Sequence, residues 1–499
     1  MAADLVTGFA ARLAGLRVCV AGLGVSGPPA IRLLAAHGAL VTAVDSRDDA
    51  ERQAAADKLA GLGATVLLGA AAASAVPAGT QLVVTSPGWQ PDAPLLMAAA
   101  AAGIDVIGDV ELAWRLRPAL PDRGRQRWLA VTGTNGKTTT VRMLAAILAA
   151  AGCRAIAAGN VGTSVADVVT RAEPYEVVAV ELSSFQLHWS STIAPDAAVV
   201  LNLAAHHLDW HGDFESYVAD KARIYAPGTI AIGNADDARS AQLAESAAAA
   251  GTGRLVQFRL GEPGPGELGI AGGFLVDRAF AANGGPAGPA DLGIRLAAVS
   301  DVCGLDPRAG GRPPAPHNVA DALAAAALAR AYGAPPAAIG AGLRAFRPEP
   351  HRIHLVGSVR GVDFVDDSKA SNPHAAAASL AAFSSVVWVA GGQFKGIDAD
   401  LDQLVSGAAA RLRGVVLLGA DRARIASALA RHAPDVPVVE AAGTDTGVMD
   451  LVVRQAAELA RPGDTVLLAP AAQSFDIFRD YPARGDAFAA AVRRLAAAR

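Results

Sequence analysis

The segment Thr132–Thr139, with the sequence TGTNGKTT, follows a short apolar run and precedes a predicted helix that begins near Thr140. Backbone amides of such a loop can surround phosphate groups, and Lys137 can reach the β- and γ-phosphates. The Thr138 hydroxyl can bind Mg²⁺. The first glycine of the general GxxxxGK[ST] pattern is replaced by Val131, but the remaining residues still favour a nucleoside triphosphate site over a chance turn.

A second glycine loop, Gly22–Gly27, follows the first predicted strand with the sequence GLGVSG. Glycines at this place allow backbone N–H groups to approach a phosphate at a helix N-terminus. Asp45 closes the next predicted strand, where an acid can accept a hydrogen bond from a ribose or a base. The motif by itself is consistent with a nicotinamide dinucleotide site, and also with a tight turn that packs a helix against a strand.

Polar side chains follow later strands of the middle part of the chain. Glu181 ends the strand 177–180 and is suited to hold Mg²⁺. His207 follows the strand 198–203, and its spacing from His211 would also suit zinc, although no third ligand is evident. Lys221, judged by helix propensity alone, is an exposed helical lysine.

The segment Asp366–Pro373, with the sequence DDSKASNP, follows the predicted strand 362–365. Its two carboxylates, a hydroxyl group and Lys369 suit recognition of an anionic, amine-bearing or nucleotide ligand, while Asp367 or Ser368 could instead cap a helix. Arg352 lies just past the proline-containing segment Arg347–His351 and could meet a nucleotide phosphate across domains.

The elements that position these residues are short β-branched strands alternating with Ala- and Leu-rich helices. This pattern predicts an α/β fold with parallel sheets that bind ligands at the carboxyl ends of their strands. Two polar, proline-containing segments, Arg117–Arg127 and Arg347–His351, predict linkers. The chain of 499 residues therefore divides into domains at 1–117, 118–347 and 348–499. The Gly/Pro-rich stretch 261–289 is expected to hold loops and an irregular strand pair.

The composition argues against several classes of protein. Lys and Arg number 43 and Asp and Glu 47, which leaves a net charge of −4 and no basic footprint for nucleic acid or acidic membranes. Three cysteines without CxxC spacing support neither a disulfide framework nor a thiolate zinc site. No signal peptide and no apolar run long enough for a membrane span are evident, so we expect a cytoplasmic protein without membrane insertion.

Taken together, the order of motifs resembles the Mur ligases, ATP-dependent enzymes that form amide bonds in peptidoglycan precursor synthesis. The resemblance covers nearly the whole chain and rests on TGTNGKT, GNVG, VELSSFQ, the segment 202–209, Lys221, His317-Asn318 and His351-Arg352. DDSKASNP resembles the D-glutamate-adding branch of the family, as do GGQFKG at 391–396 and APAAQSFD at 469–476.

The resemblance implies a role for each matching residue. The expected ATP-binding residues are Gly133, Thr134, Asn135, Gly136, Lys137, Thr138, Thr139, Asn318, Arg352 and Asp367. The expected ligands of two Mg²⁺ ions are Thr138, Glu181, His207 and Lys221, the last as a carbamate, and with Lys137 they form the expected catalytic set. The expected contacts to the UDP-sugar are Gly24, Ser26, Asp45, Ser46, Arg47, Ser86, Gly88 and Asn160. The expected D-glutamate site consists of Lys369, Ser371, Lys395, Ser474 and Tyr481.

The implied architecture has a Rossmann-like first domain for the UDP-sugar, a central P-loop ATPase domain and a Rossmann-like last domain for the amino acid and nucleotide. The implied reaction joins D-glutamate to UDP-N-acetylmuramoyl-L-alanine through an acyl phosphate, in a monomer that acts only on small molecules. Three residues depart from the family pattern, namely His206, Asp321 and Tyr481.

Alternatives are another amino-acid-adding Mur ligase or a relative of folylpolyglutamate synthase, and DDSKASN argues against both. A nicotinamide-dependent oxidoreductase would use GLGVSG but would not need the second phosphate loop. A non-catalytic nucleotide-binding regulator would keep Lys137 but would not need Glu181, His207 and Lys221 together.

Overall fold

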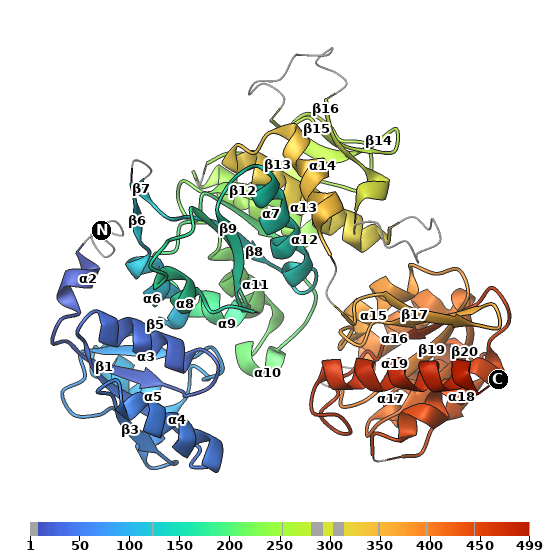
Figure 1. The fold of residues 1–499 in the computed structure, drawn as a ribbon, viewed down its shortest axis with the longest axis horizontal. Coiled ribbons are helices and arrows are strands. Elements are labelled where there is room, and N and C mark those ends of the chain that lie inside the picture. The colour runs from blue at the N-terminus through green and yellow to red at the C-terminus, as the bar shows by residue number, and fades with distance from the viewer. Residues whose placement is uncertain are drawn as a thin grey trace. The chain divides into compact units, whose positions relative to one another are not determined.

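The computed structural model describes residues 8–121, 124–160, 162–251, 253–280, 293–302, 314–347, 350–394, 398–443 and 445–498. The chain forms two compact units (Figure 1). The first contains the described residues up to Val302 together with Asn318–Phe346, and the second includes the residues from Arg347 onward. Among the described residues, the first unit holds two large β-sheets and one two-stranded sheet, and the second unit holds one large sheet. Helices cover the large sheets (Figure 1).

The N-terminal sheet has five parallel strands in the order β3-β2-β1-β4-β5. These strands are β1 (Arg17–Ala21), β2 (Leu40–Asp45), β3 (Thr65–Leu68), β4 (Leu82–Thr85) and β5 (Asp105–Gly108). The helical segments around them are α2 (Phe9–Arg12), α3 (Gly27–Ala36), α4 (Ala50–Ala60), η1 (Ala72–Ser74), α5 (Pro94–Ala101) and α6 (Asp109–Leu116). The strand order reverses between β1 and β4, so the loops after these strands diverge and leave a crevice at the carboxyl edge.

The central sheet has nine strands in the order β16-β15-β14-β13-β12-β11-β8-β10-β9. They are β8 (Arg127–Thr132), β9 (Ala155–Gly159), β10 (Val177–Glu181), β11 (Ala197–Val200), β12 (Ile230–Asn234), β13 (Leu255–Phe258), β14 (Glu267–Ala271), β15 (Phe274–Asp277) and β16 (Ile294–Ala298). Its helical segments are α7 (Lys137–Ala150), α8 (Val165–Val169), α9 (Ser184–His188), α10 (Leu208–His211), α11 (Phe214–Ala222), α12 (Ala238–Ala249), η2 (Val299–Asp301), α13 (Pro316–Tyr332) and α14 (Pro336–Ala345). Strands β14, β15 and β16 pair antiparallel, and the other pairs are parallel.

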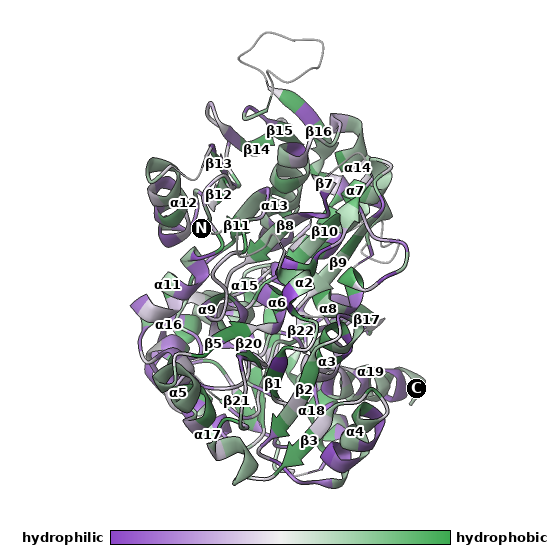
Figure 2. Cartoon of the chain, turned by 90° about the vertical axis from the view of Figure 1, so that its left-hand side faces the viewer, coloured by the Kyte–Doolittle hydropathy of each residue, from purple (hydrophilic) through white to green (hydrophobic). Residues whose placement is uncertain are grey.

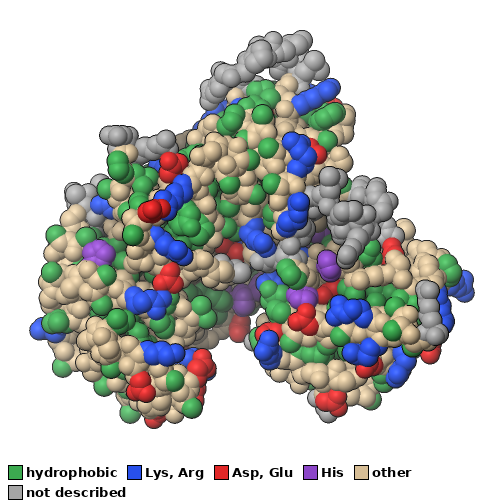
Figure 3. Space-filling view, in the orientation of Figure 1, with side chains coloured by type: hydrophobic (Ala, Val, Ile, Leu, Met, Phe, Trp, Pro, Cys, Tyr) green, Lys and Arg blue, Asp and Glu red, His purple; other side chains and the backbone are tan. Residues whose placement is uncertain are grey.

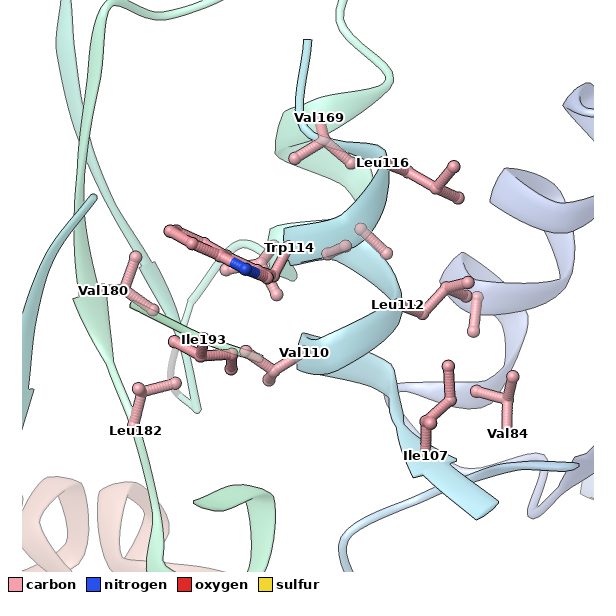
Figure 4. Packing of buried hydrophobic residues seen from close by; sticks show 14 of the residues in the cluster. Val84, Ile107, Val110, Leu112, Trp114, Leu116, Val169, Val180, Leu182 and Ile193 are labelled. Carbon is pink, nitrogen blue, oxygen red and sulfur yellow. The ribbon is translucent and has the colours of Figure 1, made fainter. Parts of the chain in front are cut away.

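Helix α6 joins these two sheets into one unit. Its residues Leu112 and Leu116 point toward the N-terminal sheet, whereas Val110 and Trp114 point toward the strand β10 side (Figure 4). One continuous set of buried apolar residues therefore runs from the N-terminal sheet through α6 to the central sheet. Because apolar burial is non-directional and proportional to area, a core shared in this way couples the stability of the two domains.

The second unit holds a six-stranded sheet in the order β17-β18-β22-β19-β20-β21, parallel except for β17. Its strands are β17 (His354–Val359), β18 (Val362–Asp366), β19 (Val386–Gly391), β20 (Leu412–Leu418), β21 (Val438–Glu440) and β22 (Thr465–Leu468). Its helical segments are α15 (Pro373–Leu380), α16 (Asp398–Ala408), η3 (Ala409–Arg411), α17 (Arg422–His432), α18 (Val448–Leu459) and α19 (Tyr481–Ala497). Separate apolar clusters fill the two faces of this sheet.

The predicted α/β class with parallel sheets is confirmed. The central strands are largely apolar, and polar residues gather on covering helices such as α4 and α12 (Figure 2). Three local expectations were wrong or incomplete. Helix α7 begins at Lys137 rather than near Thr140, β11 ends at Val200 rather than Leu203, and the first linker contains a short hairpin of β6 (Ala119–Leu120) and β7 (Gly124–Arg125). The strand pair expected within 261–289 is β14–β15, and residues 281–289 lie outside the described part of the chain.

Acidic and basic side chains alternate over the visible surface of both units without a large patch of one sign (Figure 3). This distribution agrees with the small net charge of −4. Among the described residues, no helix has the length and apolar character that crossing a bilayer requires.

Candidate active site

All eight residues predicted to contact the UDP-sugar line one cavity of about 480 Å³ in the first unit. They come from the loop after β1, the end of β2, the loop after β4 and the loop after β9. The cavity opens where the strand order of the N-terminal sheet reverses, which is where open α/β sheets usually bind ligands. Its volume lies in the range of small-molecule sites.

Asp45 holds the glycine loop in place at one wall of this cavity. Its Oδ2 accepts a hydrogen bond from the backbone N–H of Leu23 at 2.8 Å, and its Oδ1 accepts one from Arg47 N–H at 3.0 Å. The Arg52 guanidinium Nε lies 3.2 Å from Oδ2. Asp45 is 6% exposed and lines the cavity.

Sequence reasoning missed several residues of the cavity wall, including Arg52, Trp89, Asp109, Ser164 and Gln186. Asp109 directly follows β5, and the rule that ligands bind at the carboxyl ends of parallel strands could have identified it. Arg52 lies in the first turn of α4, where no local pattern distinguishes it from a surface arginine.

The phosphate loop Gly133–Thr139 connects β8 to α7. Gly136 stands at the N-cap with φ 84°, and a Cβ there would lie 2.2 Å from Asp321 Oδ1. Only glycine fits this backbone and this space. Asp321, one of the departures from the family pattern, therefore packs directly beneath the loop. The Lys137 ammonium donates to the carbonyl oxygens of Gly133 at 3.0 Å and Thr134 at 2.9 Å, so its charge lies over the loop.

A chain of hydrogen bonds runs from this loop to the cavity. The Thr138 hydroxyl donates to Glu181 Oε2 at 2.8 Å, and Asn160 Nδ2 donates to Glu181 Oε1 at 3.3 Å. Asn160 itself lines the cavity. Gly159, just before it, has φ 126°, and a Cβ there would come within 2.1 Å of the Glu181 carbonyl oxygen. Backbone contact between the ends of β9 and β10 thus places Glu181 between the two predicted substrate sites.

Lys221 is buried, at 2% exposure, although helix propensity alone indicated an exposed lysine. That expectation was wrong because α11 packs its lysine face against the carboxyl end of β8. The Lys221 amine donates to Thr132 Oγ1 at 3.1 Å and to the Gly133 carbonyl oxygen at 2.9 Å. Burial lowers the pKa of Lys221 well below its ordinary value, which favours the uncharged amine.

The neighbouring Asp220 does not form its ion pair with Lys221. Its carboxylate lies within 3.0 Å of Nδ1 of both His188 and His211, and 3.3 Å from Arg223 Nε. The other ring nitrogen of His211 lies 2.9 Å from Ser184 Oγ. Both ring nitrogens of His211 are therefore engaged in hydrogen bonds, which argues against the zinc alternative with His207.

His207 begins α10 with φ 56°, and its ring packs against Phe185. Burial lowers the pKa of His207 to about 4 and that of His206 to about 3, so both imidazoles are neutral near pH 7. A neutral imidazole can donate a lone pair to a metal ion.

Most of the side chains beside the phosphate loop that could bind a metal ion offer oxygen atoms as ligands. Within the described residues no three His, Cys, Asp or Glu side chains cluster closely enough to hold a metal ion by themselves. Mg²⁺ usually takes one or two carboxylates and completes its coordination with water and substrate phosphates. The buried Thr138 hydroxyl and Glu181 carboxylate beside the phosphate loop fit this requirement.

The predicted nucleotide residues outside the loop lie in both units. Asn318 is half-buried on α13 of the first unit. Arg352 precedes β17 in the second unit, and Asp367 follows β18 there. Asp367 is buried and accepts a hydrogen bond from the Ser379 hydroxyl, and burial raises its pKa to about 6.

Within the second unit, the loops after β18 and β22 lie side by side and carry the predicted amino-acid site. Ala471 N–H donates to the Ala370 carbonyl oxygen at 2.9 Å, and the Lys369 ammonium lies 4.0 Å from the centre of the Tyr481 ring. Ser371 is half-buried beside Lys369, and Ser474 is buried in the neighbouring loop. Lys395 lies outside the described residues.

Arg484 of α19 fastens these two loops together and was not identified from the sequence. Its guanidinium donates to Ser368 Oγ at 3.0 Å, to the Ser368 carbonyl oxygen at 2.9 Å and to the Ala472 carbonyl oxygen at 3.0 Å. The side chain is 1% exposed, and burial lowers its pKa to about 10, so it remains a cation at neutral pH.

Three family models match successive parts of the chain. They are described as the Mur ligase MurD-like N-terminal domain at residues 16–108, the Mur ligase middle domain at 131–264 and the Mur ligase glutamate ligase domain at 351–472. The chain belongs to the Mur ligase family. The predicted three-domain architecture of a Mur ligase is thereby confirmed.

Relatives within the Mur ligase family are similar over nearly the whole chain. The UDP-N-acetylmuramoylalanine--D-glutamate ligase of Thermobifida fusca is 59% identical over 97% of this chain and 99% of its own length. The protein of the same name from Streptomyces avermitilis is 56% identical over 97% and 99%. Among solved structures, the UDP-N-acetylmuramate-alanine ligase of Thermotoga maritima matches with a TM-score of 0.55 and 17% identity, covering 97% of this chain and all of the other, which shows the shared Mur ligase fold.

Proposed function

We propose that this Mur ligase joins D-glutamate to UDP-N-acetylmuramoyl-L-alanine with hydrolysis of ATP, in peptidoglycan precursor synthesis. The observation that carries the proposal is the Thr138–Glu181–Asn160 chain, because it brings a triphosphate loop and a UDP-sugar cavity to opposite sides of one carboxylate. The D-glutamate ligases of Thermobifida fusca and Streptomyces avermitilis, similar along the whole chain, support the choice of substrate.

The first step must bring two anions together, because a substrate carboxylate attacks the γ-phosphorus of ATP and displaces ADP. The Lys137 ammonium and the amides of Gly133–Thr139 offset the repulsion at the phosphates. Thr138, Glu181 and His207 would hold Mg²⁺, which when bound neutralises charge that develops on the transferring phosphoryl group. The product is an acyl phosphate.

The second step is attack of the D-glutamate amine on the acyl carbon, with inorganic phosphate leaving. Lys369, Ser371, Ser474 and Tyr481 would hold the amino acid, and Lys395 is assigned to the same site from the sequence resemblance alone. Positive charge at Lys369, close to the Tyr481 ring, suits the two carboxylates of D-glutamate. Asn318, Arg352 and Asp367 would hold the adenine nucleotide.

Lys221 would act as a carbamate, formed when its uncharged amine reacts with CO₂. Burial keeps the amine deprotonated, and its place beside Gly133 would put the new carboxylate next to the phosphate loop. An arginine could not take this role, because its guanidinium stays protonated.

The test is release of phosphate from ATP in the presence of UDP-N-acetylmuramoyl-L-alanine and one amino acid at a time. We expect turnover that requires D-glutamate and both other substrates. Turnover with L-alanine, L-lysine or diaminopimelate in place of D-glutamate would assign the chain to another branch of the family. No turnover with any amino acid would favour a regulator.

A further inference from the structure

Asp109 is the first residue of α6 and lines the cavity that we assign to the UDP-sugar. The residue is 4% exposed. Its Oδ1 has no hydrogen-bond partner among the described residues. A buried carboxyl oxygen without a partner loses its hydration and gains nothing in exchange, which costs free energy. An oxygen of this kind in a cavity wall can accept a hydrogen bond from a bound ligand.

A purely structural role does not account for this oxygen. Gly108, not Asp109, stands at the N-cap of α6, and no side-chain cap hydrogen bond is formed there. An acid in the first turn interacts favourably with the helix dipole and with the backbone N–H groups of Asp109 and Val110, but these interactions leave Oδ1 without a hydrogen-bond partner among the described residues. The next acid of α6, Glu111, shows the contrast, because its carboxylate accepts from Thr192 N–H at 3.1 Å and from Arg115 Nε–H at 2.8 Å.

Two other polar residues of the cavity wall already accept hydrogen bonds from the protein backbone. Gln186 Oε1 accepts from Ser183 N–H at 3.0 Å, and Ser164 Oγ accepts from Ala166 N–H at 3.2 Å. The cations of the cavity lie elsewhere, since the Arg52 guanidinium pairs with Asp45 and Glu51, and Arg47 lies beside Asp45 and Asp49. Burial raises the pKa of the Asp109 carboxyl to about 7, and its Oδ1 is available as an acceptor for a hydrogen-bond donor of a bound ligand.

We propose that Asp109 is a specificity-determining residue that accepts a hydrogen bond from a hydroxyl or amide N–H group of the sugar in the UDP-linked substrate. The inference rests on the proposed function, because it presupposes a UDP-sugar in the cavity. The diphosphate then lies at the Gly22–Gly27 loop, and the sugar extends from it past Asp109 toward Asn160. That direction leads the acyl end of the substrate to the Thr138–Glu181 pair.

The test compares UDP with UDP-N-acetylmuramoyl-L-alanine as ligands of the full-length protein by calorimetry. In Asp109→Ala the affinity for UDP-N-acetylmuramoyl-L-alanine should fall about 10–100-fold, as expected for loss of a hydrogen bond to a carboxylate. The affinity for UDP, which lacks the sugar, should change less than about twofold. Asp109→Asn keeps an acceptor oxygen and should recover part of the loss. Asp105→Asn, at the exposed start of β5, is the matched control and should bind both ligands like the unmodified protein.

Two outcomes would overturn the inference. Equal losses for UDP and for UDP-N-acetylmuramoyl-L-alanine would show that Asp109 only supports the fold of the cavity. Unchanged binding of both ligands in Asp109→Ala and Asp109→Asn would show that no sugar donor reaches it. Failure of the unmodified protein to bind UDP-N-acetylmuramoyl-L-alanine would instead reject the proposed function, which keeps the two failures distinct.

Discussion

The amine of Lys221 donates to the carbonyl oxygen of Gly133 at 2.9 Å, which fixes a buried lysine of α11 against the first residue of the phosphate loop. The two residues are 88 positions apart in the chain. Their contact brings the only buried helical lysine among the described residues to the loop predicted to hold ATP.

Lys221→Ala should reduce kcat at least about 100-fold, because the variant cannot form the proposed carbamate that would hold Mg²⁺. A short carboxylate such as acetate or formate, added to the variant, should restore part of the rate. Phosphate release with and without the additive measures both effects. Lys58→Ala, at an exposed lysine of α4, is the matched control and should retain full activity. A Lys221→Ala protein that is as active as the unmodified protein would reject the carbamate.

Glu181→Gln should raise the Mg²⁺ concentration needed for half-maximal rate by about 10–100-fold, because the amide removes the negative charge beside Thr138. Removal of Mg²⁺ with a chelator should abolish turnover in both proteins. Titration of Mn²⁺ followed by electron paramagnetic resonance gives an independent reading of metal affinity. Glu173→Gln alters an exposed acid of the same domain and should leave the metal requirement unchanged. An unchanged requirement in Glu181→Gln would exclude this carboxylate as a ligand.

Arg484→Lys should raise the KM for D-glutamate about 10-fold or more while the KM for ATP stays within about twofold. The lysine keeps the charge but cannot bond Ser368 and Ala472 at once, so the loops that carry Lys369 and Ser474 lose their relative position. Steady-state kinetics separates the two constants. Arg494→Lys, an exposed arginine on the same helix, controls for a general effect of shortening the side chain. Equal changes in both KM values would indicate a global effect on the second unit.

Trp114→Ala should lower the free energy of unfolding of the first unit by about 3–5 kcal/mol. The indole is 5% exposed and packs edge-on against Trp128 with ring centres 5.2 Å apart, so its removal opens a cavity in the core shared by the two domains. Denaturant unfolding monitored by fluorescence measures the change. If the substitution destabilised the N-terminal domain alone and left the unfolding of the central domain unchanged, the result would contradict a shared core.

The stability contributed by His351 should fall as the pH rises. Its Nδ1 lies 2.6 Å from Asp366 Oδ2, and this contact raises the pKa of His351 in the folded state. A raised folded pKa means that the contribution is complete below the unfolded value near 6.5 and is lost as the pH rises through the folded pKa. Thermal unfolding of His351→Gln and of the unmodified protein should therefore differ more at about pH 5.5 than at about pH 9. A difference that does not change with pH would show that the pair does not titrate.

The sequence predicted the fold class and the three-domain order because both follow from local patterns. Buried strands read as β-branched runs, and phosphate loops need glycine at fixed positions, as Gly136 illustrates with its positive φ. These constraints act within a few residues of the chain, so the composition of each segment reveals them.

The sequence alone determined which residue types are available for chemistry, such as Lys137, Glu181 and Lys369. Only the tertiary structure decided that Lys221 is buried, that His211 serves Asp220 and Ser184, and that Arg484 joins two loops. It also decided that Asp109 lines a cavity with one buried carboxyl oxygen that has no hydrogen-bond partner among the described residues. The physical reason is that burial and hydrogen-bond partners come from segments far apart in the chain, and one residue's local pattern carries no information about them.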